Sequence, residues 1–449
     1  MIATMQGKHV SIVGAGLVGS LLAIYLVRRG YKVSVFERRP DMRLKSTDAG
    51  RSINLALSNR GLKALEEIGA ASKIRQLAIP MHGRMMHAPD NTLTFQPYGV
   101  DGQYINSIAR GSLNILLMEI AEQHGVSFYF NHRVSHVDFM DTTLTCETDG
   151  RSLHKSFDAI IGADGAFSVI RHEMQFTDRY NFSQHYIEHG YKEFLIPAGN
   201  AGHFKMESNA LHIWPRESFM LIALPNPDGS FTSTLFFPFE GKLSFASLDS
   251  DAKVRDLFQT YFPDASELMP GLLEDFKTNP TSSLVTIQCY PWVRNKTLLI
   301  GDAAHAIVPF YGQGMNAGFE DCSILNSMLD QYHDNWEETI ANFQQQRKPD
   351  TDAIAQLALD NFIEMRDLVA DKDFLLRKKI EAKLHALYPE RWIPQYSMVT
   401  FQTDIRYSEA QRLGAKQKEI MDKVMQFKGL ESTWKNLDFE QLVQSLQAT

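Results

Sequence analysis

Four short apolar runs, spread over the chain, predict the strands of one buried sheet. They are Val10–Val13, Tyr31–Phe36, Asp158–Gly162 and Leu298–Ile300, each followed within two residues by glycine or a carboxylate. Short apolar runs of this kind are typical of parallel strands that carry helices on both faces. An apolar helix is expected after the first run, continuing through Val27. The pattern therefore predicts an α/β fold.

Between the third and fourth runs the pattern becomes that of an antiparallel sheet. Phe219–Leu224 and Thr232–Phe239 flank the turn signal Asn226-Pro-Asp-Gly229, which predicts a hairpin. We expect the whole stretch Asn181–Leu284 to be rich in strands. We also expect a smaller segment, Lys73–Gly99, to join the same sheet.

From Asp350 onward, apolar residues recur every three or four positions, which predicts helices. We expect these helices to cover a site formed by the other two parts of the chain. The residues that carry the spacing are Ile354, Leu357, Ala358, Asn361, Phe362, Met365 and Leu368.

The first apolar run leads into a dinucleotide-binding motif, Gly14-Ala-Gly16-Leu17-Val-Gly19. In G-x-G-x-x-G the first glycine makes the turn, the second admits the pyrophosphate, and the third lets the helix pack on the strand. Glu37 follows the second run at the distance expected for a carboxylate that binds a ribose hydroxyl. This set indicates a dinucleotide but does not separate FAD from NAD.

The other two runs end in segments that suit further parts of such a cofactor. Asp164 lies at a strand end, and Ser168 and Arg171 fall in the early turns of the helix after it. Asp302 also follows a strand, and the loop Gly312-Gln-Gly314 opens a helix near Met315 or Asn316. A helix N-terminus attracts negative charge, so this loop suits the edge of a flavin ring that becomes anionic on reduction.

The order of the motifs predicts a discontinuous nucleotide-binding domain of the Rossmann type, with other structure inserted. We assign residues 1–72, 100–180 and 285–349 to this domain. Residues 73–99 and 181–284 form a β-rich substrate domain, and residues 350–449 form a C-terminal helical region.

Composition and charge exclude several other classes. The chain has 449 residues and a net charge of −8, which gives no basic surface for nucleic acid. Its cysteines, Cys146, Cys289 and Cys322, suggest neither a disulfide framework nor a metal cluster. His82 and His87 also lack metal-ligand spacing, and we interpret them as ordinary core or surface histidines. With no apolar run of about 18 residues, we expect a soluble, cytoplasmic protein.

Together the three nucleotide segments resemble the class A flavoprotein monooxygenases, the para-hydroxybenzoate hydroxylase-like family of aromatic hydroxylases. Further strings are similar to the kynurenine-hydroxylating branch of that family, and the resemblance extends from about Val10 to about Tyr407. Those strings are Arg51–Ser58 (RSINLALS), His82–His87 (HGRMMH), Ile187–Glu193 (IEHGYKE), Ala210–Pro215 (ALHIWP), Phe374–Ile380 (FLLRKKI) and Tyr396–Phe401 (YSMVTF).

The resemblance implies an enzyme with non-covalent FAD, NADPH as a transient reductant in a shared cleft, and O2 as co-substrate. It implies 3-hydroxylation of L-kynurenine to 3-hydroxykynurenine through a flavin C4a-hydroperoxide, in tryptophan catabolism leading towards quinolinate and NAD. The protein would bind and orient the reactants while the flavin carries the oxygen chemistry. The alternatives are hydroxylation of another anthranilate-like or phenolic acid, and an FAD-dependent reductase or oxidase that inserts no oxygen.

The resemblance also implies a set of FAD contacts. Glu37 would bind the adenosine ribose with Arg38 beside it, and Asp302 would contact the ribityl chain or the pyrophosphate. Arg110, which could instead form a simple ion pair, is included in the set. The full set is Gly14, Gly16, Leu17, Gly19, Glu37, Arg38, Ala56, Arg110, Val134, Asp164, Asp302, Met315 and Asn316.

For the substrate, the resemblance assigns Arg84, Tyr98, Asn361 and Tyr396 to the carboxylate and amino end of kynurenine. A guanidinium beside a phenol suits a carboxylate because its hydrogen bonds are charge-assisted. Without the resemblance, Arg84 would be read as a surface arginine and Tyr98 as a core ring. The walls around the aromatic ring would be Ile222, Leu224, Phe236, Met365, Pro309 and Phe310, and the role of the neighbouring Tyr311 is open.

Overall fold

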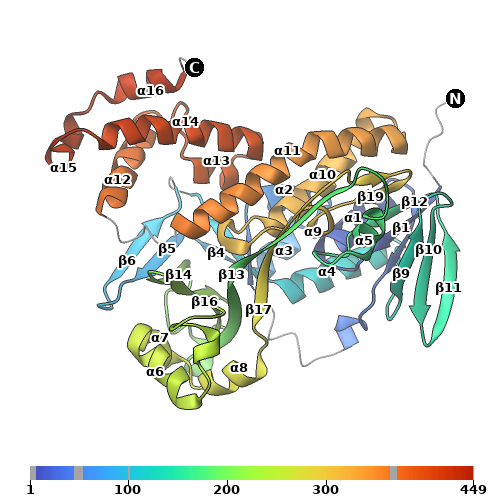
Figure 1. Ribbon diagram of the computed structural model, residues 1–449, viewed down its shortest axis with the longest axis horizontal. Coiled ribbons are helices and arrows are strands. Elements are labelled where there is room, and N and C mark those ends of the chain that lie inside the picture. The colour runs from blue at the N-terminus through green and yellow to red at the C-terminus, as the bar shows by residue number, and fades with distance from the viewer. Residues whose placement is uncertain (1–6, 45–53, 100–101, 365–371, 448–449) are drawn as a thin grey trace.

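The computed structural model of the chain describes residues 7–44, 54–99, 102–364 and 372–447. It contains a parallel sheet flanked by helices, a larger sheet backed by short helices, and a group of C-terminal helices (Figure 1). This is the predicted α/β fold with an inserted β-rich part and a helical end. Within the described ranges, every helix is too short or too polar to span a lipid bilayer.

The first sheet has six strands and brings together all four predicted apolar runs. Its order is β18-β19-β12-β1-β2-β8, and β1, β2, β12 and β19 run parallel. Parallel strands end at one edge, so the glycines and carboxylates that follow these four strands meet there. The strands are β1 (His9–Val13), β2 (Lys32–Phe36), β8 (Ser127–Tyr129), β12 (Ala159–Gly162), β18 (Val293–Arg294) and β19 (Thr297–Leu299).

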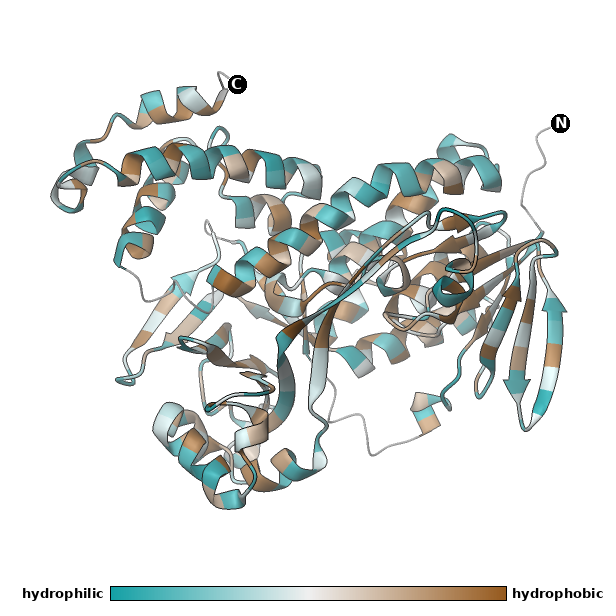
Figure 2. Cartoon of the chain, in the orientation of Figure 1, coloured by the Kyte–Doolittle hydropathy of each residue, from teal (hydrophilic) through white to brown (hydrophobic). Residues whose placement is uncertain are grey.

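Helices pack around this sheet and close its core. Figure 2 shows hydrophobic residues along the strands, as expected for a parallel sheet that is buried on both faces. Cys146, Cys289 and Cys322 are all buried and free. The helices are α1 (Leu17–Arg28), α2 (Asn59–Glu67), α3 (Ala71–Leu77), α4 (Arg110–Gln123), α5 (Val169–Met174), α9 (Asp302–His305) and α10 (Gly314–Gln331).

Two small sheets extend the nucleotide-binding part. One has the order β11-β10-β9 and the other the order β3-β7-β4. Their strands are β3 (Asn54–Leu57), β4 (Ala78–Met81), β7 (Ile105–Ala109), β9 (Arg133–Asp138), β10 (Thr143–Thr148) and β11 (Arg151–Ser156).

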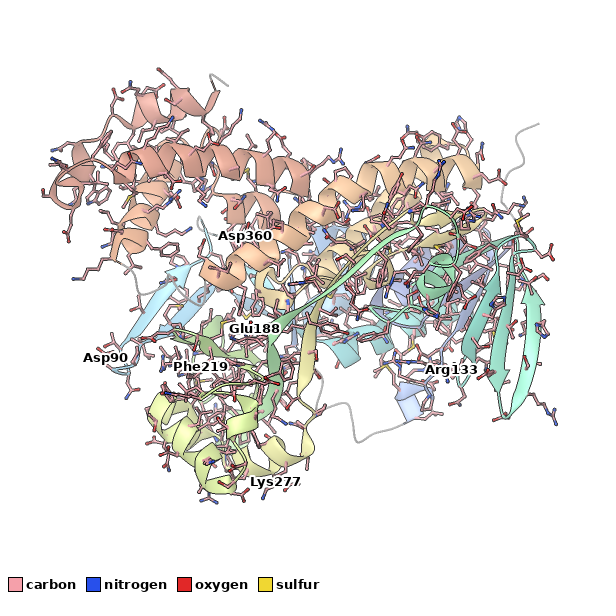
Figure 3. The ribbon with its side chains drawn as sticks, in the orientation of Figure 1. Asp90, Arg133, Glu188, Phe219, Lys277 and Asp360 are labelled. Atoms are coloured by element: carbon pink, nitrogen blue, oxygen red, sulfur yellow. The ribbon has the colours of Figure 1, made fainter. Side chains whose placement is uncertain are left out.

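The largest sheet has seven strands in the order β17-β13-β16-β15-β14-β5-β6. The predicted hairpin is β15 and β16, as expected. Of the early segment Lys73–Gly99, β5 and β6 join the same sheet, where β5 pairs in parallel with β14, but residues 73–81 form the end of α3 and strand β4 of a three-stranded sheet instead. Asp90, labelled in Figure 3, marks the turn between β5 and β6. The strands are β5 (Gly83–His87), β6 (Leu93–Pro97), β13 (Asn181–Ile196), β14 (Ala210–Arg216), β15 (Phe219–Pro225), β16 (Phe231–Pro238) and β17 (Ser282–Tyr290).

The two faces of this large sheet contact different parts of the protein. On one face, Trp214, Phe219 and Leu235 form a core with the short helices α6 (Asp251–Tyr261), α7 (Pro263–Leu268) and α8 (Leu272–Thr278). On the other face, Met220 and Phe236 pack against residues from the loop after α9 and from the C-terminal helices. Because strand residues alternate between faces, this second face is the one that can line a site.

A long helix, α11 (Trp336–Ile363), leads into the C-terminal helices. It contains Pro349 and begins before Asp350, so it continues across the predicted boundary between residues 349 and 350. In Figure 2, hydrophobic and hydrophilic residues alternate along α11 and α14, as expected for helices with one packed face. The remaining helices are α12 (Lys372–Leu387), α13 (Gln395–Phe401), α14 (Tyr407–Met425), α15 (Leu430–Thr433) and α16 (Phe439–Gln447).

A buried charge cluster around Arg347 joins α11 to α9 and α10. The Arg347 Nε lies 2.8 Å from Asp321, and its Nη1 lies 2.9 Å from Glu320 and 3.3 Å from Asp350. Asp321 also accepts from His305 at 2.6 Å, which ties α9 into the cluster. Burial alone would raise the pKa of Asp321, but His305 and Arg347 hold it below its usual value. We call these five residues the Arg347 cluster.

Arg60, at the start of α2, extends the cluster to α13. One side of its guanidinium contacts Glu320 at 2.5 Å. The other side donates to the carbonyl oxygens of Val399 and Gln402, at 2.7 and 3.0 Å, and the guanidinium lies over the Tyr407 ring. A cation is favourable there because the last carbonyls of a helix carry partial negative charge. Arg60 thereby fixes α13 on the nucleotide-binding part.

Arg347→Met should destabilise the protein, because it leaves several buried carboxylates without their cation. Removing one partner of a buried ion pair costs roughly 3–5 kcal/mol. We expect the melting temperature, measured by circular dichroism, to fall by several degrees. Arg412→Met is the control, because Arg412 and its partner Glu409 are both exposed. Equal melting temperatures for the two variants would contradict a structural role of the Arg347 cluster.

Candidate cofactor and substrate site

The glycine loop between β1 and α1 has the geometry that its sequence predicts. Gly14 has a φ of 106°, and a Cβ there would lie 2.5 Å from the carbonyl oxygen of Ala163. A Cβ at Gly19 would lie 2.0 Å from the carbonyl oxygen of Gly14. A Cβ at Gly16, by contrast, would meet no protein atom within 4 Å, and Leu17 then begins α1. Packing therefore requires the first and third glycines, whereas Gly16 leaves its position open to a ligand.

Glu37 lies at the end of β2 beside this loop. Its carboxylate accepts from the backbone N–H of Ala15 at 3.0 Å and from the Arg39 guanidinium at 2.9 Å. Burial alone would raise the pKa of Glu37, but these hydrogen bonds outweigh it and lower the pKa. Arg38, predicted to lie beside the ribose, is exposed, and the neighbouring Arg39, which is also exposed, is the residue that pairs with Glu37. An ionised carboxylate at this place can accept from a ribose hydroxyl, which is the predicted role of Glu37.

Asp164, after β12, presents an acceptor with no protein partner. Its Oδ2 accepts from the backbone N–H of Val169 at 2.7 Å, while its buried Oδ1 has no hydrogen bond among the described residues. Burial raises the pKa of Asp164. Ser168 caps α5 as its position predicts, and Arg171 donates to the carbonyl oxygen of Ala303 at 2.8 Å. The free Oδ1 of Asp164 therefore suits a hydroxyl of the cofactor, while Arg171 holds the fold together.

The loop before α10 is built around Asn316. Its amide donates to the carbonyl oxygens of Ala56 and Gly312 at 2.8 and 2.7 Å, and its oxygen accepts from the backbone N–H of Ser58 at 3.0 Å. Gly312 is left-handed, with a φ of 66°. Asn316 therefore joins β3 to the loop, and the helix begins at Gly314, close to the predicted start.

The other predicted FAD contacts lie around these segments. Asp302 is exposed at the start of α9, Met315 is half-buried in the first turn of α10, and Val134 is buried in β9. Arg110 is exposed at the start of α4. It lies close enough to Glu193 of β13 to affect that carboxyl, whose pKa burial raises to about 7 while Arg110 opposes the rise. Glu193 ends the string Ile187–Glu193, one of those that carry the family resemblance.

The glycine cradle and the free Asp164 oxygen fit FAD. The loop can approach a pyrophosphate, Glu37 and Asp164 can accept from hydroxyl groups, and the N-terminus of α10 adjoins the same edge of the sheet. The assignment of individual atoms to these residues remains a prediction.

Three predicted substrate residues lie close together: Arg84 on β5, Tyr98 after β6, and Tyr396 on α13. The Arg84 guanidinium carbon lies 5.5 Å from the ring centre of Tyr98 and 4.8 Å from that of Tyr396. The two phenol rings stack at 5.8 Å. Arg84 Nε and the Tyr98 hydroxyl are buried and have no hydrogen bond among the described residues. We call Arg84, Tyr98 and Tyr396 the clamp.

Aromatic and apolar side chains adjoin the clamp. Phe310 stacks on Phe362 at 4.3 Å and contacts Phe236 at 5.0 Å, and Tyr311 stacks on Tyr396 at 5.4 Å. Burial raises the pKa of Tyr311 well above its usual value, so this phenol stays neutral. Ile222 and Leu224 pack in the same cluster as the clamp tyrosines, and Pro309 begins the short helix that carries Phe310 and Tyr311.

Asn361 and Met365 are the remaining residues predicted to bind the substrate. Asn361 donates to the carbonyl oxygen of Phe310 at 2.6 Å, so it fixes the loop that carries the aromatic wall. Met365 lies outside the described residues.

Comparison with known proteins identifies relatives over most of the chain. Residues 8–358 match the family model described as FAD binding domain. The chain is 50% identical over 442 residues to kynurenine 3-monooxygenase of Christiangramia forsetii, covering 98% of each chain. It is 45% identical to kynurenine 3-monooxygenase of Dictyostelium discoideum, covering 94% of each.

Solved structures share the fold at lower identity. A mutant of 2-methyl-3-hydroxypyridine-5-carboxylic acid oxygenase superposes with a TM-score of 0.68 at 20% identity, covering 83% of this chain and 96% of the other. PqsL of P. aeruginosa, in complex with 2-aminobenzoylacetate, gives a TM-score of 0.65 at 20% identity, covering 81% and 97%. At this identity the similarity shows the fold alone.

Gly16→Ala should abolish most FAD binding while leaving the fold intact. The new methyl group would meet no protein atom, yet it would occupy the position at which the backbone must approach the pyrophosphate. The measurement is the flavin released by acid precipitation per mole of protein, with circular dichroism as the test of folding. Gly271→Ala is the control, because Gly271 also has a negative φ, of −91°, a Cβ there would come no closer than 4.0 Å to another protein atom, and the residue precedes α8 in the β-rich part. Wild-type flavin content in Gly16→Ala would contradict the cradle.

Proposed function

The chain belongs to the kynurenine 3-monooxygenase family of FAD-dependent aromatic monooxygenases, and from this premise we propose that it hydroxylates L-kynurenine at ring position 3. NADPH would be the reductant and O2 the co-substrate, so that one oxygen atom enters the ring and the other leaves as water. The product, 3-hydroxykynurenine, would belong to tryptophan catabolism towards quinolinate and NAD. The observation that carries the proposal is the clamp, with its unpaired donors.

The clamp supports a substrate with a carboxylate. Arg84 Nε and the Tyr98 hydroxyl are enclosed donors without a protein acceptor in the described chain. Buried donors of this kind are rarely left unpaired, and an arginine can bind a carboxylate through two parallel hydrogen bonds. Burial raises the pKa of Tyr98, with Arg84 opposing the rise, and the phenol remains a donor at neutral pH. The amino-acid end of kynurenine supplies the missing acceptor.

The aromatic ring of the substrate would lie among the apolar side chains beside the clamp. Ile222 and Phe236 come from the large sheet, and Phe310 comes from the loop after α9. These walls exclude water and orient the ring. The amino group of kynurenine already activates the neighbouring ring carbon, so the reaction needs no strong base from the protein to begin.

When bound, FAD supplies the redox chemistry, which transfers electrons from NADPH and makes one oxygen atom of O2 electrophilic. The protein holds the cofactor through the glycine loop, Glu37 and Asp164. The N-terminus of α10 favours negative charge on the adjoining ring edge. Its rigid loop, which Asn316 fixes to β3, keeps this charge in place during the reaction.

Arg84→Ala should weaken kynurenine binding by about two orders of magnitude, because a charge-assisted hydrogen bond to an enclosed carboxylate is lost. The measurement is a titration of the oxidised enzyme with kynurenine, followed by the absorbance of the flavin. FAD content should remain at the wild-type level, since Arg84 lies outside the glycine loop and the other nucleotide segments. Arg75→Ala, which removes an exposed arginine paired with Glu66, should bind kynurenine normally. Unchanged affinity in Arg84→Ala would place the carboxylate elsewhere and remove the support for this substrate.

Kynurenine should also accelerate reduction of the flavin by NADPH. The chain has one G-x-G-x-x-G segment, so NADPH would use a cleft shared with the substrate rather than a second domain of its own. The acceleration requires that kynurenine bind the reduction-competent arrangement more tightly than the resting one. Anaerobic stopped-flow spectrophotometry, with and without kynurenine, measures the rate directly. Equal rates would rule out this coupling.

A further inference from the structure

The face of the large sheet that is turned away from the clamp carries a continuous chain of polar side chains. His87 Nδ1 lies 2.7 Å from Asp264 of α7, and His87 Nε2 lies 2.9 Å from His212 Nδ1. His212 Nε2 lies 2.8 Å from the carbonyl oxygen of Glu207, and Trp214 Nε1 lies 2.9 Å from both carboxylate oxygens of Asp264. The imidazole of His87 stacks on Trp214 at 3.9 Å. We call Asp264, His87 and His212 the back-face chain.

The acceptors at the two ends of the back-face chain determine where its protons lie. A carbonyl oxygen can only accept, so His212 carries its proton on Nε2 and accepts on Nδ1. Burial lowers the pKa of His212 to about 4, which keeps this ring neutral at neutral pH. His87 must therefore donate from Nε2 to His212.

The remaining nitrogen of His87 faces Asp264, which also accepts from Trp214. Burial alone would raise the pKa of Asp264, but hydrogen bonds from His87 and Trp214 lower it. An ionised carboxylate beside a nitrogen at 2.7 Å requires a proton between them. The hydrogen bond between His87 Nδ1 and Asp264 therefore fixes the His87 ring from the side of α7.

His87 lies on the strand that carries Arg84. Residues alternate between the faces of a strand, so Arg84 points to the clamp and His87 points to the back face of β5. Beyond β5 the sheet has only β6, an edge strand with Leu93 and Phe95 exposed. On its other side, β5 pairs with β14 from Gly83 to Met86, so this pairing stops short of His87. At its His87 end the clamp strand is therefore paired on one side alone, with Leu93 of the edge strand β6.

Links from the back face supply the missing support. Asp264 binds the His87 ring from α7, and His212 binds it from β14. Arg216 of β14, the other charged group here, donates to the carbonyl oxygen of His87 at 3.0 Å and to that of Tyr261 at 2.6 Å. The end of β5 is thus tied to α6, α7 and β14.

We propose that His87 is a positioning residue for substrate binding, which holds β5 so that Arg84 meets the substrate carboxylate. It touches neither substrate nor cofactor and acts through the strand. A shift of about 1 Å in a binding group is enough to lose much of its contribution. The inference rests on the proposed function, because it takes Arg84 as the carboxylate-binding residue.

A double-mutant cycle with Arg84 tests the proposal in the FAD-loaded enzyme. His87→Phe keeps a ring against Trp214 but removes both hydrogen bonds, and Asp264→Ala removes the hydrogen bond from the helix side. Each should weaken kynurenine binding by about tenfold, raise KM similarly and leave kcat within about twofold, because only positioning is lost. In an Arg84→Ala background, His87→Phe should cause no further loss of affinity. Asp264→Asn should bind as the wild type does, since its amide can donate to a neutral His87.

Asp275→Ala is the matched control. Asp275 of α8 also fixes the large sheet from the back-face layer, but it accepts from the backbone N–H of Leu195 in β13, far along the sheet from Arg84. It should leave kynurenine affinity unchanged. Normal affinity in both His87→Phe and Asp264→Ala overturns the inference, as does an equal loss from His87→Phe with and without Arg84. Normal affinity in Arg84→Ala alone contradicts the proposed function itself, and the inference falls with it.

Discussion

Two arginines, Arg347 and Arg60, join the parts of this molecule, and the candidate site depends on that junction. Both guanidiniums are almost completely buried and share the carboxylate of Glu320. Arg347 ties α11 to α9 and α10, while Arg60 ties the end of α13 to α2. Charges removed from water are tolerable only when each finds a partner, so these five helices can pack in few other ways. Tyr396, on α13, is thereby brought to the rim of the nucleotide-binding part.

The clamp is a consequence of this arrangement. Arg84 comes from an early strand of the large sheet, Tyr98 follows the next strand, and Tyr396 comes from the C-terminal helices. These residues meet because the early segment joins the large sheet and because Arg60 fixes α13. The arrangement leaves enclosed donors without protein acceptors, which is unfavourable for the free protein. These unpaired donors select for a substrate with an acceptor such as a carboxylate, because a ligand without an acceptor at this position would leave the same donors unpaired.

The sequence predicted the parts of the fold that depend on local constraints. Gly14 needs its left-handed backbone and Gly19 its close contact whatever else the chain does, so the loop could be placed in advance. The hairpin of β15 and β16 was equally predictable, because its turn residues lie between two strand-forming runs. The beginning of α11 was missed, although Trp336, Ile340 and Phe343 lie on its buried face at helical spacing, because the boundary at residue 349 was placed from the order of the motifs. Arg347 continues that face and is held there by ion pairs.

Within the site, residues that act across long sequence distances escaped prediction. Asn316 was expected at the flavin ring. Its hydrogen bond to the backbone of β3, more than two hundred positions away, was not expected. The pairing of Glu37 with Arg39, and the nearness of Arg110 to Glu193, depend on how the chain turns after each strand. The back-face chain joins His87 to a carboxylate from a different helix, and the spacing of His82 and His87 could not reveal that partner. Such contacts follow from the fold and not from any local pattern.

The proposed reaction inserts one oxygen atom from O2 into the ring of kynurenine. The most direct test is the mass of the product formed from kynurenine and NADPH under ¹⁸O2. We predict 3-hydroxykynurenine with one heavy oxygen atom in the new hydroxyl group, and none when the label is supplied in water instead. Oxidation of NADPH that yields only hydrogen peroxide, with kynurenine recovered unchanged, would contradict the claim.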